Sequence, residues 1–166
     1  MFASHPRAVL SEIEAIVREA GAKAREATGF AVESKGSREN IVTSADVENE
    51  RFLKRRLTEL IPGSAFKGEE GDDVPVARRG YTWIVDPIDG TLNFMRHRNA
   101  SAISIALLRE KRPVLGVIYN PYAGEMFTAQ AGQGAFLNGK PISASALPFE
   151  SAMVSFGTSP YDQELA

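Results

Sequence analysis

The order of two hydrophobic patterns constrains the fold of this chain most strongly. Apolar residues recur at helical spacing from Pro6 to about Thr28 and again over 44–61, just before Pro62. Thr43 precedes the second segment and Asp46 stands three residues later, as in a helix capping box. The sequence therefore predicts two amphipathic helices before any long strand.

After the second helix the pattern changes to period two, in short runs rich in β-branched and aromatic residues. Turn residues separate these runs, and Asn138-Gly139 is a strong two-residue hairpin signal. The segment 29–40 has no sustained period, so we expect a loop or ribbon there. Consecutive hairpins predict an antiparallel sheet, and hence an α+β layered domain with both helices on one face. The expected strands are Ser64 to Lys67, Tyr81 to Asp86, Ser101 to Arg109, Pro113 to Tyr119, Glu125 to Gln130 and Ala152 to Phe156.

Composition narrows the chemistry and the expected partners. The 166 residues include no cysteine, which excludes disulfides, zinc-thiolate sites and thiol nucleophiles. A net charge of -2 argues against general binding to nucleic acid, and the basic run Lys54–Arg56 is expected to be a solvated helix face. The amino end lacks the unbroken apolar core of a signal peptide or membrane span. We expect a cytoplasmic protein with no membrane or nucleic-acid partner.

A strand that runs into two acids is the principal site candidate. The segment Trp83–Val85 is typical of a buried strand, Asp86 follows it, and Pro87 is expected to end the pairing because it lacks an N–H. The short turn would bring Asp86 and Asp89 close together. Crowded carboxylates either raise one pKa or recruit a metal, and oxygen ligands favour a hard cation such as Mg²⁺.

The residues after these acids could hold an anion. If a helix begins at Thr91, the backbone N–H groups of Gly90 and Thr91 would form an anion seat, which suggests phosphate chemistry. Each feature taken alone has an ordinary interpretation as well. The acidic turn and the adjacent Glu69 and Glu70 could be solvated loops, and Asp46 could simply stabilise a helix N-terminus.

Three motifs that follow one another along the chain favour a functional site over these ordinary interpretations. Val42–Asp46 reads V-T-S-A-D, Gly68–Glu70 reads G-E-E, and Trp83–Phe94 reads W-I-V-D-P-I-D-G-T-L-N-F. Together they resemble the inositol monophosphatase family of magnesium-dependent, lithium-sensitive sugar phosphatases. The resemblance extends through the Asn138-Gly139 turn and so covers nearly the whole chain. The pair Asn93-Phe94 is more similar to the inositol phosphatase branch than to the bisphosphate nucleotidases.

The resemblance implies a set of metal ligands. Glu69, Asp86 and Asp89 match the family's ligating carboxylates, and the backbone carbonyl of Ile88 matches a further ligand. Glu70 matches a more peripheral acid near a weaker metal site. The implied cofactor is Mg²⁺.

The resemblance also implies catalytic and substrate-binding positions. Thr91, together with Glu69, would orient the attacking water, and Asp46 would be hydrogen-bonded to Thr91. Lys35 matches a lysine on the mobile loop near the metals. The phosphate seat would comprise Asp89, Gly90 and Thr91.

The implied activity is metal-dependent hydrolysis of inositol monophosphate or a similar small polyol or sugar phosphate, by two- or three-metal in-line water attack. A bisphosphate nucleotidase or histidinol-phosphate phosphatase of the same superfamily is an alternative. A fragment that keeps the fold without catalysis is another. The resemblance also suggests a homodimer.

The sequence departs from the family pattern in one respect. The family's second signature, a Trp-Asp pair in a carboxyl-terminal α/β part, has no counterpart here because Trp83 is the only tryptophan. We expect residues 1–150 to form an amino-terminal α+β metal-binding domain and residues 151–166 to begin a truncated carboxyl-terminal domain. A site that lacks one anionic ligand is expected to bind Mg²⁺ weakly, so turnover would be impaired.

Overall fold

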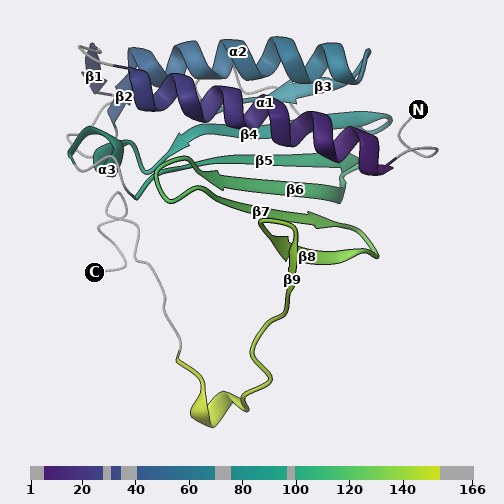
Figure 1. Cartoon of the computed structure of the whole chain (residues 1–166). Helices are drawn as coiled ribbons and strands as arrows, with labels where there is room; N and C mark the ends of the chain where they lie inside the picture. The colour runs from purple at the N-terminus through teal and green to yellow at the C-terminus, as the bar shows by residue number, and fades with distance from the viewer. Residues whose placement is uncertain (1–5, 28–30, 35–40, 70–75, 97–99, 154–166) are drawn as a thin grey trace, which may run out of the picture.

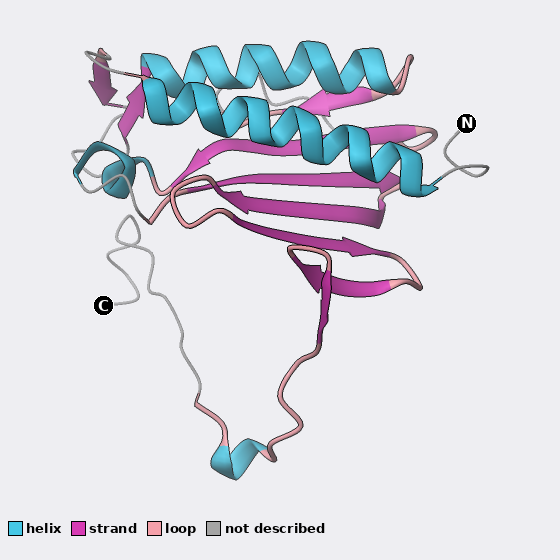
Figure 2. Ribbon diagram, viewed as in Figure 1, coloured by secondary structure: helices cyan, strands magenta, loops and turns pink. Residues whose placement is uncertain are grey.

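Two helices lie across one face of a mixed β-sheet in the computed structural model of the chain (Figure 1, Figure 2). The structure describes residues 6–27, 31–34, 41–69, 76–96 and 100–153. The helices are α1 (Pro6–Glu26) and α2 (Ser44–Leu60), as predicted. Within this described part of the chain, no helix is both long enough and apolar enough to cross a membrane.

Helix α2 begins at the predicted capping box. The Thr43 side chain accepts a hydrogen bond from the Asp46 N–H, and the Asp46 carboxylate accepts one from the Thr43 N–H at 2.9 Å. These reciprocal bonds satisfy backbone groups that the first helical turn leaves without partners. The capping box therefore fixes both the start of α2 and the position of the Asp46 side chain.

The main sheet has seven strands in the order β3-β4-β5-β6-β7-β8-β9, so strands that neighbour each other in sequence also pair in space. A separate antiparallel ribbon of β1 and β2 lies beside the start of α2. The short helix α3 (Thr91–Arg96) follows β4, and the 3-10 helix η1 (Phe149–Ser151) follows the sheet. The strands are β1 (Val32–Ser34), β2 (Ile41–Thr43), β3 (Ala65–Lys67), β4 (Tyr81–Asp89), β5 (Ala102–Arg109), β6 (Arg112–Asn120), β7 (Glu125–Gln130), β8 (Gly134–Leu137) and β9 (Lys140–Ile142).

Two strand predictions need correction. The sheet is not wholly antiparallel, because β3 pairs with β4 in parallel. The segment between these strands, 68–80, has the length that a parallel crossover needs, whereas a hairpin would be much shorter. The strand expected over 152–156 is absent at residues 152 and 153, and residues 154–156 lie outside the described part of the chain.

The hairpin at Asn138-Gly139 is confirmed, but its strands β8 and β9 were missed. Asn138 and Gly139 have φ values of 49° and 77°, the left-handed geometry that two-residue hairpin turns require. The flanking strands are short and part-exposed, so they lack the apolar alternation that reveals the longer strands. The ribbon alternative holds for 32–34, where β1 pairs with β2.

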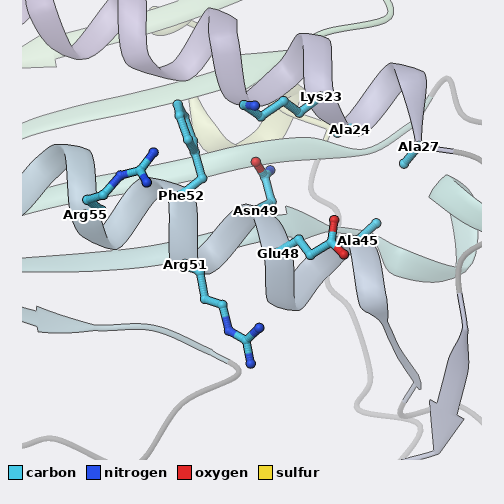
Figure 3. A pocket seen from close by; sticks show the side chains of 9 residues that line it. All are labelled: Lys23, Ala24, Ala27, Ala45, Glu48, Asn49, Arg51, Phe52 and Arg55. Atoms are coloured by element: carbon cyan, nitrogen blue, oxygen red, sulfur yellow. The ribbon is translucent and has the colours of Figure 1, made fainter.

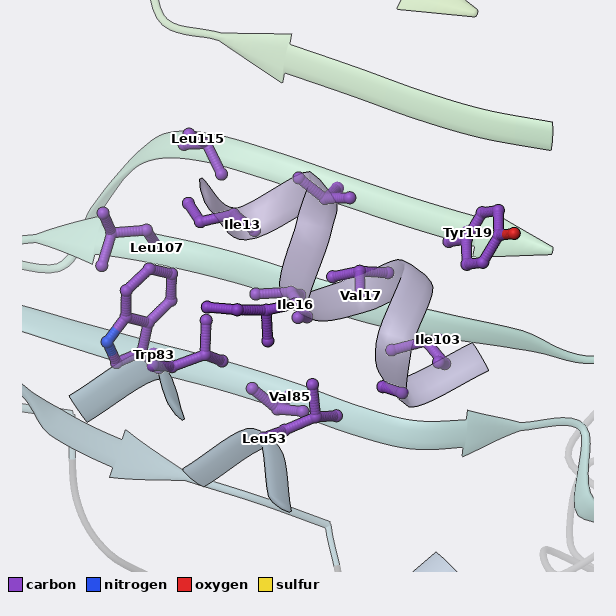
Figure 4. Packing of buried hydrophobic residues seen from close by; sticks show 14 of the residues in the cluster. Ile13, Ile16, Val17, Leu53, Trp83, Val85, Ile103, Leu107, Leu115 and Tyr119 are labelled. Atoms are coloured by element: carbon purple, nitrogen blue, oxygen red, sulfur yellow. The ribbon is translucent and has the colours of Figure 1, made fainter. Parts of the chain in front are cut away.

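The hydrophobic core lies between the two helices and the sheet (Figure 4). Trp83 in β4, Leu107 in β5 and Leu53 in α2 are all fully buried. The indole N–H of Trp83 donates to the Ser64 hydroxyl at 3.1 Å, so this polar group also has a partner. The opposite face of the sheet is more exposed, as Ile118 in β6 shows with 48% of its surface accessible.

Candidate metal centre

The candidate acids lie on an irregular end of strand β4. Pairing with β5 runs as far as Asp86 opposite Ser104 and resumes at Asp89 opposite Ala102, with a register shift between. The prediction that Pro87 ends the strand is therefore wrong. A bulge accommodates a residue that has no N–H to donate and lets the strand continue. Both acids consequently belong to an ordered sheet edge.

The Asp86 carboxyl group is electrostatically crowded. Burial, then the charge and hydrogen bond of Glu69, and then the charge of Asp89 together raise its pKa to about 8. The Ile88 N–H donates to Asp86 Oδ1 at 3.1 Å and opposes this rise. The structure therefore brings Glu69 and Asp89 each within electrostatic reach of Asp86.

The carboxylates do not yet form a closed cage. Over the described ranges, no group of three or more histidine, aspartate or glutamate side chains converges closely enough to hold a metal. Glu69 and Asp89 are exposed, so the hydrophobic core does not enclose their side chains. The donors are all oxygen atoms, which fits Mg²⁺ in chemistry.

Beside these acids, Asp46 and Thr91 are in direct contact. The Thr91 hydroxyl lies 3.1 Å from Asp46 Oδ1 and 3.2 Å from the Ile88 carbonyl oxygen. Asp46 is only 1% exposed, and its other oxygen accepts hydrogen bonds from both the N–H and the hydroxyl of Thr43. The capping box thus holds Asp46 in place against Thr91.

The turn between β4 and α3 requires glycine. Gly90 has φ +82°, and a Cβ there would lie 3.0 Å from the Ala100 carbonyl oxygen. The Gly90 carbonyl accepts from the Phe94 N–H at 2.9 Å, in the first turn of a helix that begins at Thr91, which was the condition set for an anion seat. Two further predicted residues, Glu70 and Lys35, lie outside the described part of the chain.

The comparison that decides the family is a match over residues 5–164 to the model of the inositol monophosphatase family. The chain belongs to the inositol monophosphatase family. The family interpretation made from the three motifs is confirmed.

Relatives of this family member include the inositol-1-monophosphatase of Bacillus subtilis. It is 36% identical over 125 residues, which are 74% of this chain and 47% of the relative. A Caulobacter vibrioides inositol-1-monophosphatase is 43% identical over 68% of this chain and 44% of its own length. The histidinol-phosphatase of Chlorobaculum parvum is 40% identical over 67% of this chain and 42% of that protein. The chain thus spans less than half the length of these curated relatives.

Solved structures confirm the α+β fold of this inositol monophosphatase family chain. The extragenic suppressor protein suhB from Bartonella henselae is 34% identical with a TM-score of 0.77, over 84% of this chain and 55% of that chain. The Thermotoga maritima IMPase is 30% identical with a TM-score of 0.74, over 82% of this chain and 54% of that one.

Sequence reasoning missed two polar residues on α2 of this family member. Asn49 is 3% exposed, and its Nδ2 donates to the Pro87 carbonyl at 3.0 Å. Glu50 is also buried, and its carboxylate lies where a side chain at Gly68 would have to go. Both stand three or four residues after Asp46, on the same helix face, and that spacing was the available signal.

Proposed function

We propose that this chain supplies the metal-binding part of a Mg²⁺-dependent phosphomonoesterase that hydrolyses inositol monophosphate or a similar small polyol phosphate. The observation that carries the proposal is the crowding of Asp86 by Glu69 and Asp89, next to the Asp46–Thr91 hydrogen bond. A scaffold without a ligand has no physical need for like charges at one sheet edge. A divalent cation would offset their repulsion.

Glu69, Asp86, Asp89 and the Ile88 carbonyl would hold the metal ions, with Glu70 at a peripheral site. When bound, Mg²⁺ supplies Lewis-acid activation of water and stabilises the departing oxygen.

Thr91 and Glu69 would orient the attacking water. A hydroxyl has a single hydrogen, so donation to Asp46 leaves the oxygen lone pairs of Thr91 available to accept a hydrogen bond from water. The hydrogen bonds from Thr43 hold the Asp46 carboxylate in this position. The two threonines and one aspartate would therefore fix the direction from which water approaches.

Asp89, Gly90 and Thr91 would form the phosphate seat. The left-handed Gly90 turn directs the chain into α3, and a side chain at this position would crowd the Ala100 carbonyl oxygen. Lys35 would lie on the loop near the metals, as the family resemblance implies. On the same basis we propose inhibition by lithium, a cytoplasmic location and a homodimer, with residues 1–150 as the metal-binding domain and 151–166 as the start of a second.

Other phosphate esters remain candidate substrates. The Chlorobaculum parvum relative is named a histidinol-phosphatase. One solved structure is an inositol monophosphate complex of SaIMPase-II, 28% identical with a TM-score of 0.67, and another is a 2'AMP complex of the same protein at 29% and 0.69. A panel of inositol 1-phosphate, histidinol phosphate and 2′-AMP separates these substrate classes.

Phosphate release with Mg²⁺ tests the proposal. We expect slow turnover by the 166-residue chain and much faster turnover when it is extended past Ala166 by the carboxyl-terminal part of the Caulobacter vibrioides relative. Equal rates would refute the impairment. In the extended chain Asp89→Asn should abolish turnover without unfolding, while the exposed Lys54→Gln should leave it unchanged. Full activity of the Asp89→Asn variant would contradict the proposed metal site.

A further inference from the structure

A second candidate site lies away from the acidic sheet edge. A cavity of about 360 Å³ opens between the last turns of α1 and the first half of α2 (Figure 3). Its apolar lining includes Ala24, Ala45 and Phe52. This volume is in the range of cavities that hold small organic ligands. None of the proposed metal ligands lines it.

Positive charge predominates around this cavity. Lys23, Arg51 and Arg55 line it, against the single acid Glu48. Figure 3 shows Lys23 and Arg55 on either side of Phe52, and the Lys23 ammonium lies 5.1 Å from the Phe52 ring centroid. Neither Lys23 nor Arg55 forms an ion pair with any residue that the structure describes. The cavity therefore favours an anionic ligand.

A buried hydrogen-bond acceptor that has no partner among the described residues belongs to the wall of the cavity. Asn49 lines it, and Figure 3 shows this side chain directed from α2 toward α1. Its Nδ2 donates to the Pro87 carbonyl, which can only accept, so the orientation of the amide is fixed. Its Oδ1 is buried and has no hydrogen bond to any described residue. A buried acceptor left unpaired is unfavourable, and a ligand donor would satisfy it.

We propose that this cavity binds a small hydroxylated organic anion, such as a polyol phosphate or a hydroxycarboxylate. The anionic group pairs with Lys23 and Arg55, a hydroxyl donates to Asn49 Oδ1, and the carbon skeleton lies against Ala24 and Ala45. No metal is needed, because the protein itself supplies the positive charge. This distinguishes the cavity from the proposed metal centre, which attracts cations.

The same amide connects the cavity to strand β4. Asn49 contacts Pro87, which lies in the bulge between Asp86 and Asp89. A hydrogen bond accepted at Oδ1 polarises the amide and strengthens the bond that its N–H donates. A ligand in the cavity would therefore strengthen the hydrogen bond from Asn49 to the Pro87 carbonyl, which lies between Asp86 and Asp89 in the sequence.

An NMR titration of the isotope-labelled chain in metal-free buffer tests the site. The probes are glycerol 3-phosphate, sulfate as an anion without a donor, and glycerol as a donor without charge. We expect saturable shifts of the Asn49 side-chain amide and the Ile88 N–H with glycerol 3-phosphate. Sulfate should bind roughly tenfold more weakly, since it lacks the hydrogen bond to Asn49, and glycerol should not bind. Absence of a saturable shift, or equal affinity for all three probes, would overturn the proposal.

Matched variants localise the binding. Lys23→Gln and Arg55→Gln should each weaken glycerol 3-phosphate binding by roughly tenfold. Lys54→Gln should not, because the Lys54 ammonium lies 5.8 Å from the Phe66 ring centroid, outside the cavity. Asn49→Leu should reduce the affinity to that for sulfate, and if this variant does not fold, the two cationic variants still decide. Shifts confined to Gly90 and Thr91, insensitive to Lys23→Gln, would contradict the site without bearing on the proposed hydrolase.

Discussion

Strand β4 contributes residues to two different regions, the hydrophobic core and the acidic region around Asp86. Trp83 and Val85 are buried beneath the helices, and their contacts lie within the chain. Three residues beyond Trp83, the pKa of Asp86 is raised to about 8 by burial and by neighbouring acids. The contacts of the core region stabilise the fold, whereas the like charges of the acidic region repel one another. Such a local conflict with stability is expected at functional sites.

The largest expected effect is in the core. Leu53→Ala leaves a cavity at a fully buried position and should lower the free energy of unfolding by about 2–5 kcal/mol. Urea denaturation measures this loss. Mg²⁺ affinity of the folded variant, measured by calorimetry, should match that of the unchanged chain. A large loss of affinity would show that the two regions are not independent.

Metal binding should stabilise only the chain with an intact acidic region. At Mg²⁺ about 100-fold above its Kd, the folded state should gain about 2.7 kcal/mol. Thermal unfolding with and without Mg²⁺ measures the gain, which Asp89→Asn should largely remove. Glu59→Gln, a change of an exposed acid on α2, is the control and should retain it. If Glu59→Gln lost the Mg²⁺-induced stabilisation while Asp89→Asn retained it, the metal would bind elsewhere.

The pH dependence of the metal-free chain should follow the Asp86 carboxyl group. Its pKa is raised from 3.8 to about 8 in the folded state, so the folded state holds this proton more tightly than the unfolded state does. Its contribution to stability is full below the unfolded pKa, declines as pH rises, and is lost above about 8. Urea midpoints across this range measure the decline, which Asp86→Asn should flatten. An equally steep decline in that variant would assign it to other groups.

The smallest effect is expected on the open face of the sheet. Ile118 is 48% exposed, while its neighbour Val117 on the same strand is fully buried on the helix side. Ile118→Thr should change the free energy of unfolding by about 0.5 kcal/mol or less. Val117→Thr buries a hydroxyl and should cost clearly more by the same urea measurement. Equal costs would mean that both faces are buried in solution.

Local signals in the sequence predicted much of the fold. The start of α2 was predictable because Thr43 and Asp46 bond to each other within one turn. The Asn138-Gly139 turn was predictable because few residue pairs adopt that backbone geometry. The parallel pairing of β3 with β4 was not, since it depends on a crossover rather than on any residue of either strand.

The motifs suggested candidate site residues, but the sequence could not predict their structural environment. The motifs identified Asp86 and Asp89, but Pro87 suggested that the strand ends there. The bulge could not be predicted from β4 alone, because the continuation of β4 depends on pairing with β5. The contact between Asn49 and Pro87 joins residues 38 positions apart, beyond any local pattern. The raised pKa of Asp86 likewise needs burial and a neighbour from another segment.

A Mn²⁺-containing crystal tests the central claim most directly. Mn²⁺ prefers the same oxygen ligands as Mg²⁺ and scatters anomalously, so its position can be located without ambiguity. We expect an anomalous peak bounded by the carboxylates of Glu69, Asp86 and Asp89. A map in which these three side chains stay turned apart in excess Mn²⁺, with no peak among them, would contradict the claim.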